Sequence, residues 1–301
     1  MFTSDYNKDI LSKYSDLQYR YQLKPILKIH KSLPDFRIYK EITTLTKRLY
    51  IQLYRRPITI VVGMIQPLLW IILFSALFRN MPITLLAHNI QYGEFLSPGI
   101  IIFTAFTGSM NAGLPIVFDR EFGFLNRLLA SPLITPHSLM LSSLVSIWTT
   151  TITQTISIIA CSIILFHNIS ITSHIYVIVN LSTSIIMNMA SISICLAFIL
   201  PGHIEFLAFL LITNLPVLFS STALAPLPFM PYWLQLIACT NPLTYAIEIL
   251  RDICIQRNNN ALYIIETVWI NLNLYQSICI LTFLSIISFI TVNYIITYKY
   301  E

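Results

Sequence analysis

The sequence predicts an all-α membrane protein with six transmembrane helices. Hydrophobic residues make up 56% of its 301 residues and charged residues only 10%, whereas a soluble domain carries about 25% charged residues. The charges are also unevenly placed, because twelve of the 18 Lys and Arg residues lie in residues 1–56. The rest of the chain cannot form a charged shell, so lipid must replace water as its outer solvent.

Charge-free apolar runs locate the spans. A helix needs about 20 apolar residues to cross the hydrocarbon core, and a charge at its centre costs about 2.5–3.5 kcal/mol. The run 128–204 is long enough for two spans around a polar break, and prolines interrupt the run 206–247 after its first half. We predict spans near 57–78, 98–118, 136–166, 174–200, 204–224 and 275–297.

Prolines predict where these helices begin and bend. Three dipeptides pair a capping side chain with proline at the first helical position, where proline loses no hydrogen bond. They are Ser97-Pro98, Thr135-Pro136 and Asn241-Pro242. Pro67, Pro115 and Pro216 lie inside spans and predict kinks. Amides within the spans, such as Gln154, either hydrogen-bond between helices or line a cavity.

The basic N-terminal segment predicts the orientation. Residues 1–56 hold twelve basic and five acidic residues, a net charge of +7, which favours the cytoplasmic side or its stromal equivalent. Six spans return the C-terminus to that side, where Lys299 fits. Loop 119–135 then lies on the same side, and loop 225–274 lies on the far side.

Residues 36–56 predict an amphipathic interfacial helix between a basic tail, 1–35, and the transmembrane domain, 57–298. Apolar residues recur at steps of three and four and share one helical face. They are Ile38, Ile42, Leu45, Leu49 and Leu53. Basic residues lie between them, so we expect the helix to lie along the membrane surface. A simpler role, in which the basic residues only hold this segment on one side of the membrane, is compatible with this prediction.

No catalytic or metal-binding pattern stands out. Gly108 and Gly113 have the spacing of a P-loop, but Leu114 and Pro115 follow in place of its Lys and Ser/Thr. The six histidines show no metal-ligand spacing. Since the spans also lack carboxylates suited to a proton relay, we expect no catalytic residue, metal or cofactor on this chain, no nucleic-acid partner, and an energy source outside the membrane.

Two cysteines share the long loop 225–274. Cys239 and Cys254 are candidates for a disulfide, although neither belongs to a Cys-x-x-Cys pair.

Loop 119–133 carries the most informative pattern. Asp119 fits the start of a short helix and Pro132 its end, while Phe122, Leu125 and Leu129 step along one face. Such an amphipathic helix either lies passively at the interface or docks into a partner's groove. The residues alone leave both readings open.

Three segments resemble the ABC-2 type transporter permeases. The string Asp-Arg-Glu-Phe-Gly-Phe-Leu-Asn-Arg-Leu-Leu-Ala-Ser-Pro-Leu at 119–133 is similar to the loop after that family's second span. Asn-Pro-Leu-Thr-Tyr at 241–245 resembles the segment before its last span, and the proline-rich stretch 220–231 resembles the external turn of drug- and polysaccharide-export permeases. The resemblance covers about residues 37–298 and points particularly to cyanobacterial-type and plastid-encoded members.

The resemblance implies the permease subunit of an ATP-driven exporter. ATP and Mg would be bound by a separate P-loop ATPase of the ABC type, and the permease would pair as a homodimer or with a second permease in the bilayer. A plastid (chloroplast) membrane is implied, with a bacterial inner membrane as the alternative. An energy-independent carrier or a membrane assembly factor without an ATPase remains the other reading of the residues.

The resemblance also implies that 119–131 is a cytoplasmic coupling helix. Its motif assigns ATPase coupling to Glu121, Gly123, Leu128, Leu129 and Pro132. Their neighbours Asp119, Arg120, Phe122, Leu125 and Arg127 belong to the same candidate site. Phe124 and Asn126 stand where many relatives have Thr and Glu, so the contacts on the partner are left open.

The second candidate site is the far-side motif in loop 225–274. Its residues are Asn241, Pro242, Tyr245, Glu248 and Arg251. Asn241 is placed to cap a short helix, and Glu248 and Arg251 have the spacing of a favourable i,i+3 pair. The alternative is direct contact with a transported substrate.

Overall fold

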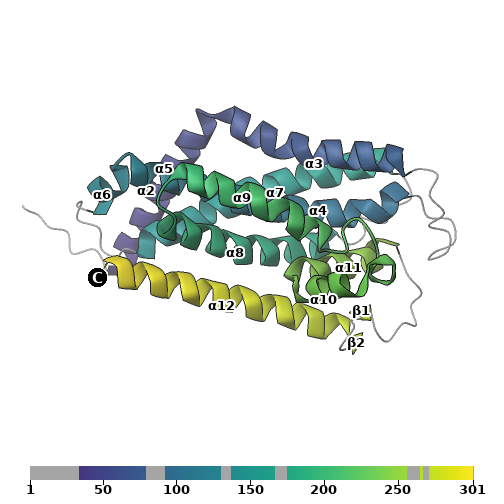
Figure 1. Cartoon of the computed structure of the whole chain (residues 1–301). Helices are drawn as coiled ribbons and strands as arrows, with labels where there is room; N and C mark the ends of the chain where they lie inside the picture. The colour runs from purple at the N-terminus through teal and green to yellow at the C-terminus, as the bar shows by residue number, and fades with distance from the viewer. Residues whose placement is uncertain are drawn as a thin grey trace, which may run out of the picture. The chain divides into compact units, whose positions relative to one another are not determined.

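The computed structural model describes residues 34–78, 92–129, 137–166, 175–255, 265–266 and 271–300. Residues 38–301 form one compact unit, and its described residues are almost entirely helical (Figure 1). Its helices are α2 (Pro34–Tyr54), α3 (Pro57–Leu77), α4 (Tyr92–Asn111), α5 (Leu114–Glu121), α6 (Phe124–Leu129), α7 (His137–Leu165), α8 (Ile175–Ile199), α9 (His203–Phe219), the 3₁₀ turn η3 (Leu227–Phe229), α10 (Tyr232–Thr240), α11 (Pro242–Ile255) and α12 (Leu274–Tyr300).

Among the described residues, five helical segments are long and apolar enough to cross a membrane. They are Pro57–Leu77, Tyr92–Glu121, Ser138–Leu165, Ile175–Ile199 and Tyr275–Ile295, and each overlaps a predicted span. The remaining predicted span, 204–224, corresponds to α9, an apolar helix of 17 residues. At 1.5 Å per residue α9 is roughly 25 Å long, shorter than the hydrocarbon core of about 30 Å.

Helix α4 is the centre of the bundle. It packs against α3, α7, α8, α9 and α11, and nearly all of its residues are buried. The buried hydroxyl side chains of α4 donate hydrogen bonds to backbone carbonyls of the same helix. Thr104 donates to the Ile100 carbonyl at 2.7 Å and Ser109 to the Ala105 carbonyl at 2.6 Å. An apolar helix covered on every side fits its lack of a polar face.

Two glycines let α3 and α4 close around one glutamine of α7. The Gln154 amide donates to the Ile60 carbonyl of α3 at 3.4 Å. A Cβ at Gly63 would lie 2.5 Å from Gln154 Nε2, and a Cβ at Gly108 would lie 2.7 Å from its Oε1. The amide therefore joins helices, one of the two roles open from the sequence, and small residues permit the close approach.

The second span differs from the prediction at both ends. Helix α4 begins at Tyr92, so Pro98 lies inside the helix and Ser97 is not its cap. The charge rule made the predicted span begin after Glu94, but Glu94 is buried inside the fold. The expected kink at Pro115 is a break between α4 and α5, because proline in the first turn of α5 has no N–H to continue α4.

The other described prolines occupy the predicted positions, and the kinks at Pro67 and Pro216 stay predictions. Pro67 and Pro216 lie inside α3 and α9. Helix α11 begins at Pro242, and the Asn241 side chain accepts a hydrogen bond from the Leu243 N–H at 3.1 Å. The pair Thr135-Pro136 lies outside the described residues.

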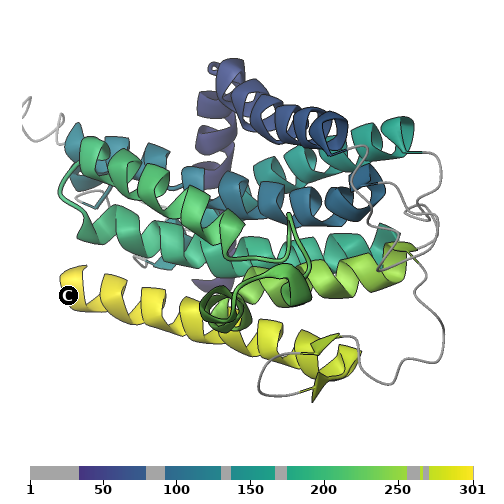
Figure 2. The same ribbon diagram turned by 45° about the vertical axis from the view of Figure 1, so that its right-hand side comes forward.

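The unit has two chemically different ends. Helices α2, α5 and α6 and the last turn of α12 gather at one end, and α10, α11, β1 (Ile265–Glu266) and β2 (Asn271–Leu272) gather at the other (Figures 1 and 2). The two strands form a short antiparallel pair. Loop 225–274 therefore contains structure that the sequence did not predict.

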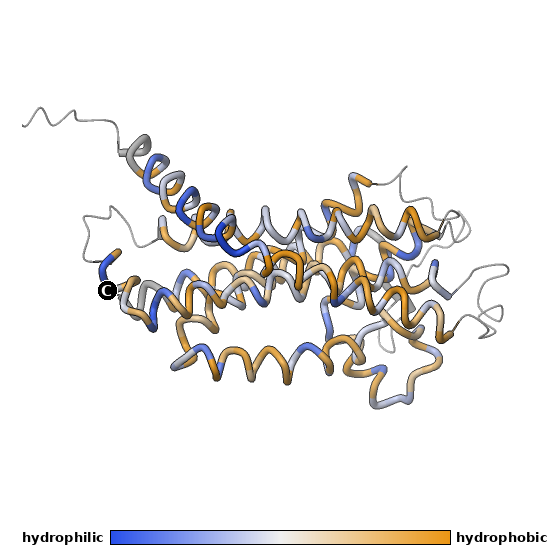
Figure 3. The backbone as a smooth tube through the Cα atoms, turned by 90° about the horizontal axis from the view of Figure 1, so that it is seen from above, coloured by the Kyte–Doolittle hydropathy of each residue, from blue (hydrophilic) through white to orange (hydrophobic). Residues whose placement is uncertain are grey.

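Hydropathy separates α2 from the spans. Figure 3 shows long apolar stretches along the bundle, whereas polar and apolar residues alternate along α2, which runs steeply across the bundle direction. Helices α3 and α12 are the least buried of the five candidate spans.

The close contacts of Gly108 predict that a larger side chain at this position destabilises the fold. Gly108→Leu should lower the free energy of unfolding by about 1–3 kcal/mol, because the added atoms overlap the Gln154 and Thr151 side chains. Thermal unfolding of the purified protein in detergent measures this change. Val62→Leu on the exposed face of α3 is the control and should melt like the wild type. An unchanged midpoint for Gly108→Leu would show that this close contact is absent.

Candidate functional site

Gly123 divides the predicted coupling helix into α5 and α6. Its φ of 72° is left-handed, a conformation that glycine adopts without steric cost. Asp119 therefore lies in the last turn of α5 and is not an N-cap. Phe122 is 77% exposed and Leu125 only 2% exposed, so the predicted common face is wrong for these two residues. The Leu129 side chain and Pro132 lie outside the described residues.

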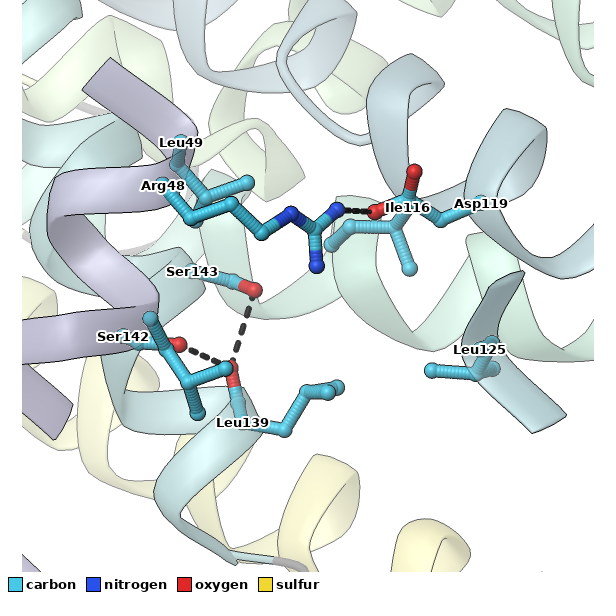
Figure 4. Close-up of a pocket in the computed structure, with 9 residues that line it drawn as sticks. Arg48, Leu49, Ile116, Asp119, Leu125, Leu139, Ser142 and Ser143 are labelled. Atoms are coloured by element: carbon cyan, nitrogen blue, oxygen red, sulfur yellow. Dashed lines mark hydrogen bonds and ion pairs between the residues drawn. The ribbon is translucent and has the colours of Figure 1, made fainter. Parts of the chain in front are cut away.

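Asp119 connects α5 to α2. Its carboxylate forms an ion pair with Arg48, as Figure 4 shows. The Arg48 guanidinium also lies 4.2 Å from the centre of the Phe124 ring of α6. Leu45, Leu49, Ile116, Leu125 and Leu139 contribute to the walls of a small cavity beside this pair. One arginine thus holds three helices together, by charge on one side and by a cation–π contact on the other.

Arg120 connects α5 to the end of α8. Its guanidinium donates to the carbonyls of Phe198 at 2.9 Å, Leu200, and Pro201 at 2.9 Å. The last carbonyls of a helix have no partner within it, and a cation there also complements the helix dipole. Arg120 is therefore the C-terminal cap of α8, supplied by a segment about 80 residues earlier in the chain.

Glu121 connects α5 to the beginning of α9. Its Oε2 lies 2.6 Å from Nδ1 of His203, the first residue of α9. The Phe118 ring packs against the His203 ring at 5.3 Å and against the Phe122 ring at 5.9 Å. The Glu121 and His203 side chains are each about one third exposed.

Three consecutive charged residues thus bind three different elements. Asp119 binds α2, Arg120 binds the end of α8, and Glu121 binds the start of α9. Sequence reasoning missed Arg48 and His203 as their partners. A signal for Arg48 existed, since it follows Leu45 by three residues and so shares the inward face of α2.

The rest of the segment faces outward. Phe122 and Arg127 are exposed, and Phe124 is 38% exposed. Leu128 is half-buried. A Cβ built at Gly123 would have no atom within 4 Å. The segment therefore presents two aromatic rings and one cation around an open glycine turn.

The far-side motif forms a compact structural network. The Asn241 amide donates to the Val217 carbonyl at 3.1 Å, and the Tyr245 hydroxyl donates to the Cys239 carbonyl. These bonds join α11 to α9 and α10. The network supports the structural reading of the motif.

Arg251 is the most connected residue of this network. It pairs with Glu248, donates to the Thr222 carbonyl at 2.6 Å, and stacks on the Phe95 ring of α4 at 3.8 Å. The predicted i,i+3 pair is therefore present, and the arginine is buried. Cys239 and Cys254 are separate buried thiols in this structure.

The cap on α8 predicts that the two arginines of the segment are not equivalent. Arg120→Met should lower the free energy of unfolding by about 1.5–3 kcal/mol, because hydrogen bonds from a charged donor are lost. Arg127→Met, at an exposed site in the same segment, is the matched control. Thermal unfolding in detergent compares the two. Equal midpoints for both variants would contradict the capping role.

A buried thiol predicts sensitivity to alkali. Burial raises the pKa of Cys254 from 9.0 to about 12. The folded state therefore holds this proton more tightly than the unfolded state. The resulting stability is complete below about pH 9 and is lost as pH rises toward 12, by up to about 1.4 kcal/mol per pH unit.

Cys254→Ala should lose stability less steeply than the wild type over that alkaline range, as measured by chemical unfolding at several pH values. Cys279→Ala, at an exposed thiol, should keep the wild-type slope. Identical slopes for all three proteins would rule out a contribution from Cys254.

Comparison with known proteins identifies the family. The family model described as ABC-2 type transporter matches residues 40–255. Two relatives named transport permease ycf38 are each 46% identical to the chain. The one from Porphyra purpurea aligns over 88% of this chain and 92% of its own length, and the one from Pyropia yezoensis over 95% and 99%. A namesake from Cyanophora paradoxa is 43% identical, over 86% and 90%. The chain belongs to the ABC-2 type transporter family of multi-pass membrane permeases.

Proposed function

We propose that this chain is the transmembrane permease subunit of an ATP-binding cassette exporter whose ATP is hydrolysed by a separate P-loop ATPase. One observation carries the proposal beyond family membership. Asp119, Arg120 and Glu121 tie α5 to α2, α8 and α9, while the adjoining Phe122 stays exposed. A segment that is bound to three helices on one side and exposes an apolar side chain on the other is suited to contact an ATPase and to transmit its movement.

The mechanism follows from these links. An ATPase dimer that closes on ATP would move α6 and the exposed turn, and α5 would follow as a rigid body. The charged contacts would pass the movement to α2, to the end of α8 and to the start of α9. The break between α4 and α5 lets α5 reorient without dragging the whole of α4. ATP binding would then shift the population between inward- and outward-facing states.

The proposal includes six spans, with α9 as the fifth. Its exposed apolar residues support this assignment, and they include Leu211, Ile212, Leu215 and Phe219. A helix somewhat shorter than the hydrocarbon core is accommodated by local thinning of the bilayer. The domain assignment is then a tail at 1–35, an interfacial helix at 36–56 and a transmembrane domain at 57–298. Both termini would lie on the cytoplasmic or stromal side.

Two permease copies would complete the pathway. The apolar surfaces of α3 and α12 are largely uncovered within one chain, so lipid or a second copy must cover them. We propose a homodimer about a two-fold axis, with a second permease as the alternative. The relatives come from plastid-bearing red algae and a glaucophyte, which supports a plastid membrane. We propose no cofactor on this chain, with ATP and Mg on the ATPase.

The test is capture of the ATPase. The tagged chain is purified from its native membrane in mild detergent, with and without ATP, and co-purifying proteins are identified by mass spectrometry. A stoichiometric P-loop ATPase should be recovered. Phe122→Asp, Glu121→Arg and Gly123→Trp should reduce its recovery at least tenfold, because each alters the exposed turn or its anchor.

Phe229→Asp is the matched control, since Phe229 is also exposed but lies in η3, which directly precedes α10 and is far in the chain from the Gly123 turn. It should retain the ATPase. A clean preparation without any ATPase, under conditions that preserve other membrane complexes, would instead favour a carrier or an assembly factor. Normal ATP-dependent transport by the three turn variants would remove residues 119–131 from the mechanism.

A further inference from the structure

Helix α2 turns its apolar stripe toward the protein. None of Ile38, Ile42, Leu45, Leu49 and Leu53 is exposed. Leu45 and Leu49 line the small cavity together with residues of α5 and α7. Arg48 on the same side reaches Asp119. The sequence alone predicted a helix along the membrane surface, whereas at Leu45 and Leu49 this stripe faces other helices of the chain.

The opposite face of α2 is basic and aromatic. Lys47, Arg55 and Arg56 are exposed, and Tyr54 is 86% exposed. Lys47, Ile51, Tyr54 and Arg55 follow one another at helical spacing. The three cations have no ion pair with an acid within the described part of the chain. We call Lys47 and Tyr54 of α2, together with Arg55 and Arg56 directly after the helix, the outer face of α2.

The position of this face next to a span places it near lipid headgroups. Arg56 directly precedes Pro57, the first residue of the span α3. The outer face therefore lies where the bilayer changes from hydrocarbon to headgroups. Tyrosine is favoured at that level, and each nearby Lys or Arg strengthens the attraction to anionic lipid.

We propose that the outer face of α2 binds anionic lipid headgroups, through their phosphate or sulfonate groups. Lys47, Arg55 and Arg56 supply the positive charge, and Tyr54 supplies a ring that packs at the headgroup level and a hydroxyl that can donate to an anionic oxygen. The proximity of a span favours lipid over a protein partner. The inference rests on the membrane-spanning character of the chain and does not require an ATPase.

The bound headgroups would act on the opposite side of the same helix. Arg48 lies between Lys47 and Leu49 and holds α5 through Asp119. Anionic lipid on the outer face would keep α2 at one depth, and through Arg48 it would keep α5 in place. The lipid composition of the membrane would thereby set the position of the outward turn at Gly123.

The test is a lipid titration of the purified full-length chain by native mass spectrometry. The probes are phosphatidylglycerol, a glycolipid with a sulfonate headgroup, and phosphatidylcholine. Both anionic lipids should bind more tightly than phosphatidylcholine. The variant K47Q/R55Q/R56Q should weaken their binding by about fivefold for each cation removed, and about 0.5 M salt should weaken wild-type binding as well.

Two further variants separate charge from folding. Lys47→Gln is well removed from the span, so it tests the face without disturbing membrane insertion, and it should weaken anionic lipid binding about fivefold. Arg127→Gln removes an exposed cation from α6 and should leave lipid affinity unchanged. Equal anionic lipid affinity in the wild type and Lys47→Gln would overturn the proposal.

Three other outcomes would also overturn it. Weakening of lipid binding by Arg127→Gln as large as that by Lys47→Gln would show a diffuse charge effect. Displacement of the lipid by millimolar inorganic phosphate would indicate a free-anion site. Loss of ATPase capture in the triple variant, with lipid affinity unchanged, would assign the outer face to a protein partner.

Discussion

Backbone polar groups inside a bilayer must find their partners within the protein, and the α4–α5 rod shows how this constraint shapes the fold. The break at Pro115 frees carbonyls in the last turn of α4. Ser193 of α8 donates to one of them, the Met110 carbonyl, at 2.6 Å. A Cβ at Gly113 would lie 2.2 Å from the Ser193 oxygen, so glycine is needed where α8 approaches. The break is thus held in place by its neighbour.

The need to satisfy backbone groups within the protein also gives α5 a structural role, in addition to its proposed role in transmitting movement from the ATPase. The carbonyls that end α8 are covered by Arg120, and the start of α9 carries His203 against Glu121. Removing these side chains would damage the bundle before any question of transport arises. This is why Phe122 and Arg127, which are exposed, and not the charged side chains that bind other helices, are the informative sites for separating docking from folding.

Sequence reasoning located the spans because an unpaired charge in hydrocarbon is costly, so charge-free runs mark them. The same reasoning began the second span too late, since it could not foresee that Glu94 would be buried by the fold. It also read 119–131 as one helix. Helical spacing reports which residues share a face only while the helix continues, and the left-handed Gly123 ends it.

Local sequence patterns could not predict which residues pair with Asp119 and Glu121. Arg48 and Asp119 are 71 residues apart, and Glu121 and His203 are 82 apart. Such pairs depend on how α2 and α9 pack, which no spacing rule encodes. The far-side motif was easier, because the Asn241 cap and the Glu248–Arg251 pair are local.

The buried Arg251 has a consequence for how the protein is made. A guanidinium keeps its charge under all ordinary conditions, so α11 cannot bury it until the Thr222 carbonyl and the Phe95 ring are both in place. Phe95 belongs to the second span, and Thr222 follows α9. The seat of α11 is therefore completed by two other parts of the chain, and a chain whose earlier spans were misassembled would leave this arginine with only its local partner Glu248.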